Sequence, residues 1–149
     1  MPAYRSIVVG TDGSETSLAA VERAAEVAAD GDAELVIVCA YTPASREDTA
    51  QAEDALKDEA YLVVGWSPAE ETLRSAEERA AAKGARKIRT SAVDGAPVDV
   101  LRAAVTESGA GLLVVGNKGL NTLSGRILGS VPSDVARRSG VDVLIVHTT

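Results

Sequence analysis

The chain has 149 residues, of which 46% are hydrophobic and 25% are charged, so it is long enough for one domain with one core and too apolar for an extended disordered chain. Its 22 acidic and 15 basic residues give a net charge of −7, which argues against binding nucleic acid or an anionic membrane through the overall field. A single cysteine, Cys39, excludes an intramolecular disulfide and a thiolate cluster for zinc or iron. The sequence has neither an apolar run of about 18 residues nor a hydrophobic leader, which predicts a cytoplasmic protein.

Short runs of Val, Ile and Leu alternate with longer segments of helical period. Near-continuous apolar runs are typical of strands that are covered on both faces, as in a parallel sheet. One weaker run, at residues 87–93, alternates polar and apolar residues and favours an edge strand. In chain order, we expect strands at residues 6–10, 34–41, 87–93, 112–116 and 141–147.

The segments between these runs predict helices. Apolar residues recur on one helical face in the first segment, and glycine ends most of the others as a C-cap. Pro132 falls in the first turn of the last helix, where a missing N–H costs little. We expect helices at residues 15–29, 69–83, 98–108 and 130–139. Strands that alternate with helices in this way predict right-handed crossovers and an α/β fold, a three-layer doubly wound sandwich in a single domain.

The connection at residues 42–66 is longer than is usual between neighbouring elements. It is polar at first and then carries a short apolar run at residues 61–64. We interpret residues 48–60 as a helical middle that flanks a binding region or an interface. A mobile loop is an equally good interpretation of the same residues.

A glycine-rich loop follows the fourth predicted strand. Glycine permits positive φ and lets backbone N–H groups approach an anion with no Cβ in the way. The helix that begins at Ser130 adds unpaired amides, the positive end of its dipole and a hydroxyl group. These features together predict a phosphate site. The glycines of the loop are Gly116, Gly119, Gly125 and Gly129.

The charges of this loop point the same way. Between Asn117 and Ser133 lie two cations, Lys118 and Arg126, and no acidic residue. The local charge of this loop is therefore positive, whereas the net charge of the chain is negative. An alternative remains open on spacing alone: the glycines serve only turns and caps, Ser130 is only an N-cap, and both cations belong to a solvated face.

The loop matches neither the Walker A pattern nor the dinucleotide G-x-G-x-x-G fingerprint. Its spacing, from Gly116 and Gly119 to Gly129 and Ser130, resembles the G-x2-G-x9-G-[ST] nucleotide motif of universal stress proteins. The resemblance extends along the chain and also covers residues 7–14, 95–97, 129–132 and 143–146.

The resemblance implies a five-stranded parallel sheet of order 3-2-1-4-5, in which the first and fourth strands are neighbours. It implies that Asp12 accepts hydrogen bonds from ribose, that Gly10 and the backbone of Ala40 contact adenine, and that the glycine loop holds the phosphates. From the residues alone, Asp12 has an alternative role as a helix N-cap, in capping-box spacing with Glu15. The full set of implied contacts is Gly10, Thr11, Asp12, Ala40, Val115, Gly116, Lys118, Gly119, Gly129, Ser130 and Val131.

The implied ligand is ATP, with Mg²⁺ bridging its phosphates, or cyclic AMP, since residues 56–61 look similar to a cyclic-AMP-binding subgroup. The implied role is a regulatory sensor or buffer of adenine nucleotides in the stress response. Alternatives are a slow ATPase or adenylyl-transferring enzyme on the same scaffold, and a scaffold with a vestigial site. The family also implies a homodimer through residues 141–149, whose edge strand pairs across a two-fold axis.

Overall fold

The computed structural model describes residues 3–43, 62–117 and 130–148. The strands are β1 (Ser6–Gly10), β2 (Glu34–Thr42), β3 (Leu62–Val64), β4 (Lys87–Asp94), β5 (Leu112–Gly116) and β6 (Asp142–Val146). The helices are α1 (Glu15–Gly31), α3 (Trp66–Ala82), α4 (Pro97–Ser108) and α5 (Ser130–Arg138).

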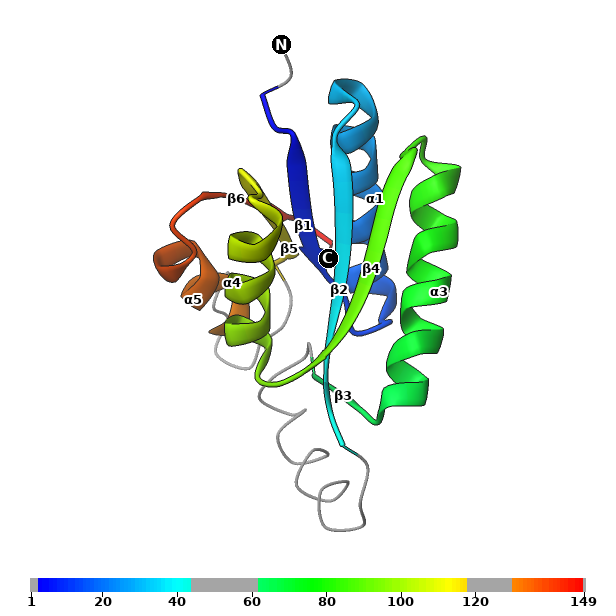
Figure 1. The fold of residues 1–149 in the computed structure, drawn as a ribbon, viewed down its shortest axis with the longest axis vertical. Helices are drawn as coiled ribbons and strands as arrows, with labels where there is room; N and C mark the ends of the chain where they lie inside the picture. The colour runs from blue at the N-terminus through cyan, green and yellow to red at the C-terminus, as the bar shows by residue number, and fades with distance from the viewer. Residues whose placement is uncertain (1–2, 44–61, 118–129, 149) are drawn as a thin grey trace.

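The five long strands form one parallel sheet in the order β4, β2, β1, β5 and β6 (Figure 1). Counted along the chain without the short β3, this is the predicted order 3-2-1-4-5, which is confirmed. β1 therefore lies between β2 and β5, although more than 100 residues separate β1 from β5 in the sequence. The predicted edge strand at residues 87–93 is also confirmed, because β4 pairs with β2 and lies at one side of the sheet.

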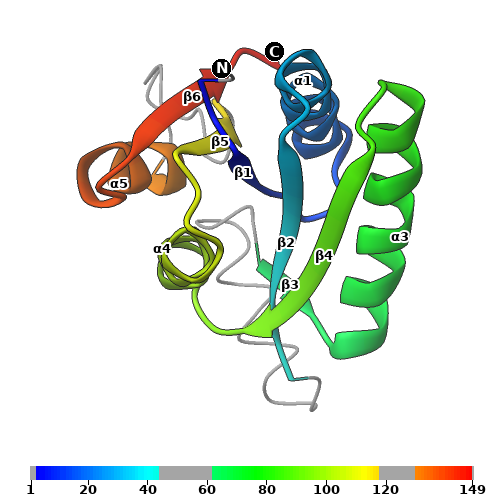
Figure 2. The ribbon, with the colours of Figure 1, turned by 45° about the horizontal axis from the view of Figure 1, so that its top comes forward.

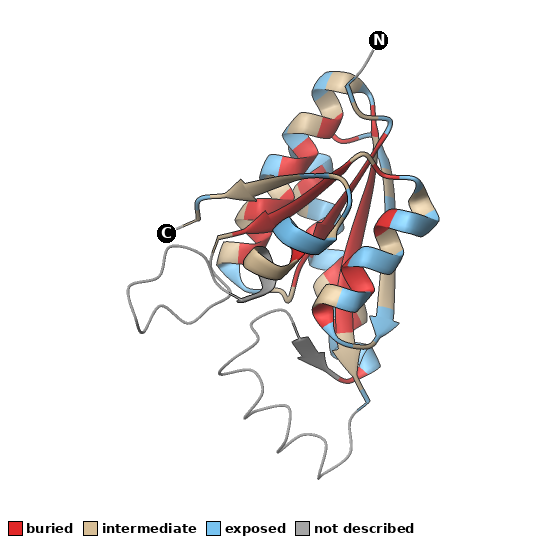
Figure 3. Ribbon diagram, turned by 90° about the vertical axis from the view of Figure 1, so that its left-hand side faces the viewer, coloured by how far each residue is buried: buried red, intermediate tan, exposed pale blue. Residues whose placement is uncertain are grey.

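Helices cover both faces of the sheet, which confirms the three layers (Figure 2). α1 and α3 pack on one face around a cluster rich in alanine, and α4 and α5 pack on the other face around a cluster of valines and leucines. Successive residues of β1, β2, β5 and β6 contribute to opposite clusters, as the alternation of side chains requires. Since the chain contains no Phe, the helices pack closely on small side chains. In Figure 3 the central strands are buried, while β6 is only partly buried.

The end of the long connection differs from the prediction. Leu62–Val64 forms the short strand β3, and the helix predicted from residue 69 begins at Trp66. Gly65 occupies the N-cap with a φ of 93°, and Pro68 falls in the first turn, where its missing N–H is tolerated, so the helix starts three residues earlier than expected. The predicted helical middle at residues 48–60 lies outside the described residues.

β3 pairs with β2 on the same side as β1, beyond the point where β1 ends. β4 pairs with β2 from Glu34 to Tyr41 on one side, and β1 pairs with Glu34 to Val38 on the other. β3 pairs with β2 from Ala40 to Thr42, so it takes the edge of β2 that β1 leaves open beyond Val38. The sheet is thereby prolonged at its carboxyl end, directly beyond β1.

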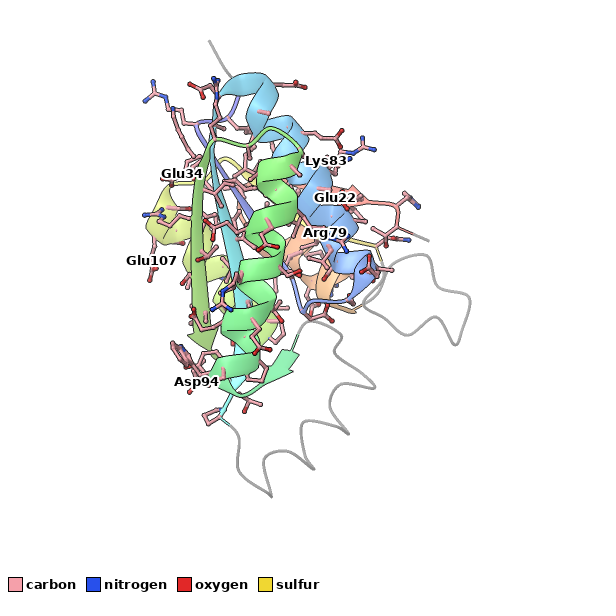
Figure 4. The ribbon with its side chains drawn as sticks, turned by 90° about the vertical axis from the view of Figure 1, so that its right-hand side faces the viewer. Glu22, Glu34, Arg79, Lys83, Asp94 and Glu107 are labelled. Carbon is pink, nitrogen blue, oxygen red and sulfur yellow. The ribbon has the colours of Figure 1, made fainter. Side chains whose placement is uncertain are left out.

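Salt bridges connect α1 and α3 on the surface. Arg79 contacts Glu15 at 2.9 Å and Glu22 at 3.4 Å, and Lys83 contacts Glu22 at 3.7 Å (Figure 4). All of these side chains are at least partly exposed to solvent, so the contribution of the pairs to stability is small. In the described parts of the chain, no helix is long and apolar enough to cross a membrane.

Two buried serines should respond oppositely to the same substitution. Ser6 Oγ has no hydrogen-bond partner among the described residues, whereas Ser17 Oγ contacts Thr11 Oγ1 at 2.8 Å and donates to the Ser14 carbonyl at 2.9 Å. We expect Ser6→Ala to leave the free energy of unfolding unchanged or to raise it by about 1 kcal/mol, and Ser17→Ala to lower it by about 1–3 kcal/mol. Urea denaturation of both variants measures this difference, and equal losses would contradict it.

Candidate functional site

The sheet brings several of the predicted site residues that the structure describes together at its carboxyl edge. Gly10, the last residue of β1, is in register with Val38 of β2, and Val9 is in register with Val114 of β5. Val115 and Gly116 therefore end β5 beside the end of β1. The strand order reverses between β1 and β5, and ligands of doubly wound proteins bind at this kind of switch point.

A pocket with about 180 Å³ of empty space, part of it open solvent, lies where β1, β2 and α4 meet. Three of its lining residues are among those predicted for the nucleotide, and the other four come from β2 and α4. Its wall is almost entirely apolar, which suits the face of a flat heterocycle. The pocket is lined by Gly10, Thr11, Val38, Ala40, Pro97, Val100 and Leu101.

Gly10 is needed for the close approach of α4 to the end of β1. A Cβ at this position would lie 2.9 Å from Leu101 Cδ2 and would force the leucine side chain to move. Because Gly10 and Leu101 both line the pocket, that movement would change its shape.

The turn after β1 is built from hydroxyl groups. Thr11 is fully buried; its N–H donates to the Val38 carbonyl at 3.0 Å, and its Oγ1 contacts Ser17 Oγ at 2.8 Å. Thr11 Oγ1 also accepts from the Gly13 N–H at 3.0 Å. Gly13 has a φ of 86° and is packed against Thr72, so the turn has little room to rearrange. Thr11 lines the pocket, but its hydroxyl group is occupied in holding the turn.

Asp12 is not the N-cap of α1, so the capping-box alternative is wrong. Ser14 is the N-cap, and its Oγ accepts from the Ser17 N–H at 3.2 Å. Asp12 lies two residues before the N-cap. Its Oδ1 accepts from the Ser14 N–H at 2.9 Å, and its own N–H donates to Ser17 Oγ at 3.3 Å. Among the residues that the structure describes, Asp12 Oδ2 accepts no hydrogen bond. The turn thus holds the carboxylate half-exposed at the carboxyl edge of the sheet.

Ala40 lines the pocket near the end of β2, where it also pairs with β3. Val38 and Thr42 both direct their carbonyl groups toward the β1 and β3 side of β2, where they accept from Thr11 and Gly65. Ala40 has the same parity and is in register with Leu62 of β3, so its backbone groups face that strand. The side chain of Ala40 belongs to the hydrophobic cluster on the α4 face of the sheet.

The remaining predicted residues belong to the glycine loop and the helix after it. Lys118, Gly119 and Gly129 lie outside the described residues. Ser130 and Val131 form the first turn of α5, as predicted, so the backbone amides of a helix start are present there. Because right-handed crossover helices run antiparallel to the strands, α5 begins at the same edge of the sheet as the pocket.

Four pocket residues were missed by the prediction from sequence. Val38 belongs to β2, and Pro97, Val100 and Leu101 project from the first turns of α4. A signal for the α4 residues was present, because positions i, i+3 and i+4 of a helix share one face. Their approach to β1 depends on Gly10 and on the crossover from β4, which the helical period alone does not reveal.

Cys39 takes no part in this site and is predicted to be unreactive in the folded protein. Burial raises the pKa of its thiol from the usual 9.0 to about 12, so almost no thiolate forms at pH 8. We expect iodoacetamide to label Cys39 rapidly in urea and very slowly in native buffer, as measured by mass spectrometry. Because the pKa is raised on folding, the stability linked to this thiol is complete below pH 9 and is lost at about 1.4 kcal/mol per pH unit from there toward pH 12. Rapid native labelling at pH 8 would contradict this burial.

The fold defines a doubly wound α/β protein with an apolar pocket at the carboxyl ends of β1 and β2, beside the topological switch point between β1 and β5. Residues 3–147 match the universal stress protein family, and the chain belongs to that family. Within the described residues, no group of three or more His, Cys, Asp or Glu side chains is placed to hold a metal ion.

Relatives match along their whole length. The chain is 53% identical over 149 residues to universal stress protein Rv1636 of Mycobacterium tuberculosis, with 100% of both chains covered. It is similar to the crystal structure of a universal stress protein in complex with cAMP, with 47% identity, a TM-score of 0.75 and 99% of each chain covered. It is also similar to the crystal structure of Rv1636, with 45% identity, a TM-score of 0.63 and coverage of 100% of this chain and 99% of that one.

Proposed function

We propose that the protein binds an adenine nucleotide at the carboxyl edge of its sheet and acts as a regulatory sensor or buffer of that nucleotide. The observation that carries the proposal is the apolar pocket between Gly10, Ala40 and Leu101, with the carboxylate of Asp12 at the adjoining turn. The relative solved in complex with cAMP, at 47% identity, supports an adenine nucleotide as the ligand.

Each part of the ligand has a matching part of the site in this proposal. The purine lies against the apolar wall formed by α4 and the end of β2. Asp12 Oδ2 accepts hydrogen bonds from the ribose hydroxyl groups, while Oδ1 keeps its bond to Ser14. The phosphate lies toward Gly116 and the first turn of α5, where the backbone amides of a helix start and the helix dipole favour negative charge. Lys118, Gly119 and Gly129 complete this half of the site.

We favour cyclic AMP as the ligand, and ATP with Mg²⁺ bridging its phosphates is the competing outcome. The choice rests on the 47% identity to the cAMP-bound relative across nearly the whole chain. If ATP binds, the magnesium ion is carried by the phosphates.

We also propose that the protein is a homodimer through residues 141–149. β6 is an edge strand that pairs with β5 on one side, and a free strand edge presents N–H and C=O groups that a second copy is able to pair with. Antiparallel pairing of two β6 strands across a two-fold axis would satisfy these groups in both copies.

The ligand is tested directly on the purified protein. We expect mass spectrometry of small molecules released by denaturation to detect an adenine nucleotide. Calorimetric titrations with cyclic AMP and with ATP plus Mg²⁺ then compare the affinities of the protein for the two nucleotides. If neither titration shows saturable binding to protein that has been freed of ligand, the proposal is wrong.

Asp12→Asn should weaken nucleotide binding without unfolding the turn. The asparagine keeps an oxygen that is able to accept from the Ser14 N–H, but it removes the charge and presents an NH₂ group to the ribose. We expect an affinity loss of about 1–3 kcal/mol, measured by calorimetry with the better of the two nucleotides. The matched control is Asp30→Asn on the outer surface of α1, which should bind normally. Equal affinities of the two variants would exclude Asp12 from ribose recognition.

A further inference from the structure

The side chain of Asn117 connects the start of the glycine loop to the end of the chain. Its Oδ1 accepts from the Thr148 backbone N–H at 2.9 Å and from Thr148 Oγ1 at 3.1 Å. Its own backbone N–H donates to the Val146 carbonyl at 2.9 Å. Asn117 and Thr148 are both partly buried. We call these three hydrogen bonds, between Asn117 on one side and Val146 and Thr148 on the other, the clasp.

The clasp continues the β5 and β6 ladder beyond the point where both strands end. The bond from Asn117 N–H to Val146 follows the parallel pattern of the ladder, whose last registered pair is Gly116 with Val146. The next acceptor would be a backbone carbonyl, and the side-chain carbonyl of Asn117 takes its place for Thr148. The side chain of Asn117 thus takes the place of a strand backbone, which holds Asn117 and Thr148 in fixed positions relative to each other.

We infer that Asn117 is a positioning residue that couples occupancy of the nucleotide site to the order of the C-terminal edge. The inference rests on the proposed function, because Gly116, directly before Asn117, is one of the residues proposed to face the ligand. A shift of the backbone at Gly116 toward a phosphate moves Asn117 as well, and hydrogen bonds of 2.9–3.1 Å weaken steeply when their geometry changes. Coupling of this kind is reciprocal, so breaking the clasp at Thr148 changes the affinity for the nucleotide.

The test compares two single variants with their combination. Asn117→Ala removes the acceptor, and Thr148→Pro removes both donors, the N–H and the hydroxyl group, without changing the net charge. We expect each variant to weaken the binding of cyclic AMP, titrated by calorimetry, by about fivefold, at the lower end of typical coupling between sites. The double variant should be no weaker than either single one, because both changes break the same clasp. Thr148→Ser, which keeps both donors, should bind like the wild type.

Hydrogen exchange provides a second measurement. If Asn117 had only a structural role, cyclic AMP would not change the exchange rate of the Thr148 amide. We expect cyclic AMP to slow exchange of the Thr148 amide in the wild-type protein and to leave it unchanged in Asn117→Ala. Affinities of both single variants within twofold of wild type, or losses that simply multiply in the double variant, would overturn the coupling while leaving the proposed function intact. A wild-type protein that binds neither cyclic AMP nor ATP would overturn the proposed function and this inference together.

Discussion

Gly10→Val is expected to abolish nucleotide binding. The new Cβ would lie 2.9 Å from Leu101 Cδ2, and the two methyl groups of valine would extend into the space that Gly10 leaves open. Leu101 would have to turn, and the pocket between β1 and α4 would be partly filled. We expect calorimetry to show an affinity lower by about a hundredfold or more, corresponding to roughly 2.7 kcal/mol of binding free energy.

The fold should survive this substitution at reduced stability. Overpacking of a core position costs about 1–3 kcal/mol, and Gly10 does not have the positive φ that would strain any larger residue. The matched control is Gly111→Val at the opposite edge of the sheet, where a Cβ would lie 3.2 Å from the ring of Tyr4. We expect Gly111→Val to lower the melting temperature but to bind normally. Unaltered binding by Gly10→Val would show that the purine lies elsewhere.

Ile145→Pro is expected to separate the proposed dimer while each protomer stays folded. Asn117 N–H donates to the Val146 carbonyl, so Val146 and, by alternation, Leu144 direct their backbone groups toward β5. The N–H of Ile145 therefore faces the free edge, where a second copy would pair. Proline at this position removes a donor that only the dimer uses, and sedimentation should show monomers at concentrations where the wild type is dimeric.

Two companion variants make this result specific. Ile145→Ala removes the packing of the side chain on the α4 and α5 face but keeps the N–H, so it should remain a dimer at slightly lower stability. Leu144→Pro removes a donor of the ladder within the protomer, so it should unfold or aggregate. A monomeric Ile145→Ala would mean that side-chain packing, and not the backbone edge, holds the copies together, and an Ile145→Pro variant that stays dimeric would exclude the β6 edge as the interface.

Most of the fold is predictable from sequence because its signals are local. The apolar runs of β1, β2 and β5 are long, continuous and rich in Val and Ile, and Gly109 marks the end of α4 with a φ of 66°. β3 was missed because three residues are too few to show a period, and its pairing with Ala40 to Thr42 depends on where β1 ends. The start of α3 was missed because Gly65 and Pro68 were interpreted as part of a loop.

The candidate site shares some residues with the set expected from sequence. Gly10, Thr11 and Ala40, which the resemblance to the family implies as nucleotide contacts, line one pocket, and their contact with a nucleotide stays a prediction. The sequence did not show that the Thr11 hydroxyl group is bonded within the turn, because that depends on Ser17 lying over it one helical turn later. It also did not show that the backbone of Ala40 faces β3, since that follows from a register between distant segments.

The central position of β1 has a consequence for the way the protein is made. β1 is synthesised first, but one of its two neighbours, β5, leaves the ribosome only after residue 112, and β6 comes later still. Long-range parallel pairing of this kind is slow because a large loop must close before the contact forms. The growing chain is thus able to join β1 to β2 early, while the switch point between β1 and β5 forms only after β5 has been synthesised. A product truncated before Leu112 would lack β5 and with it the switch point of the sheet.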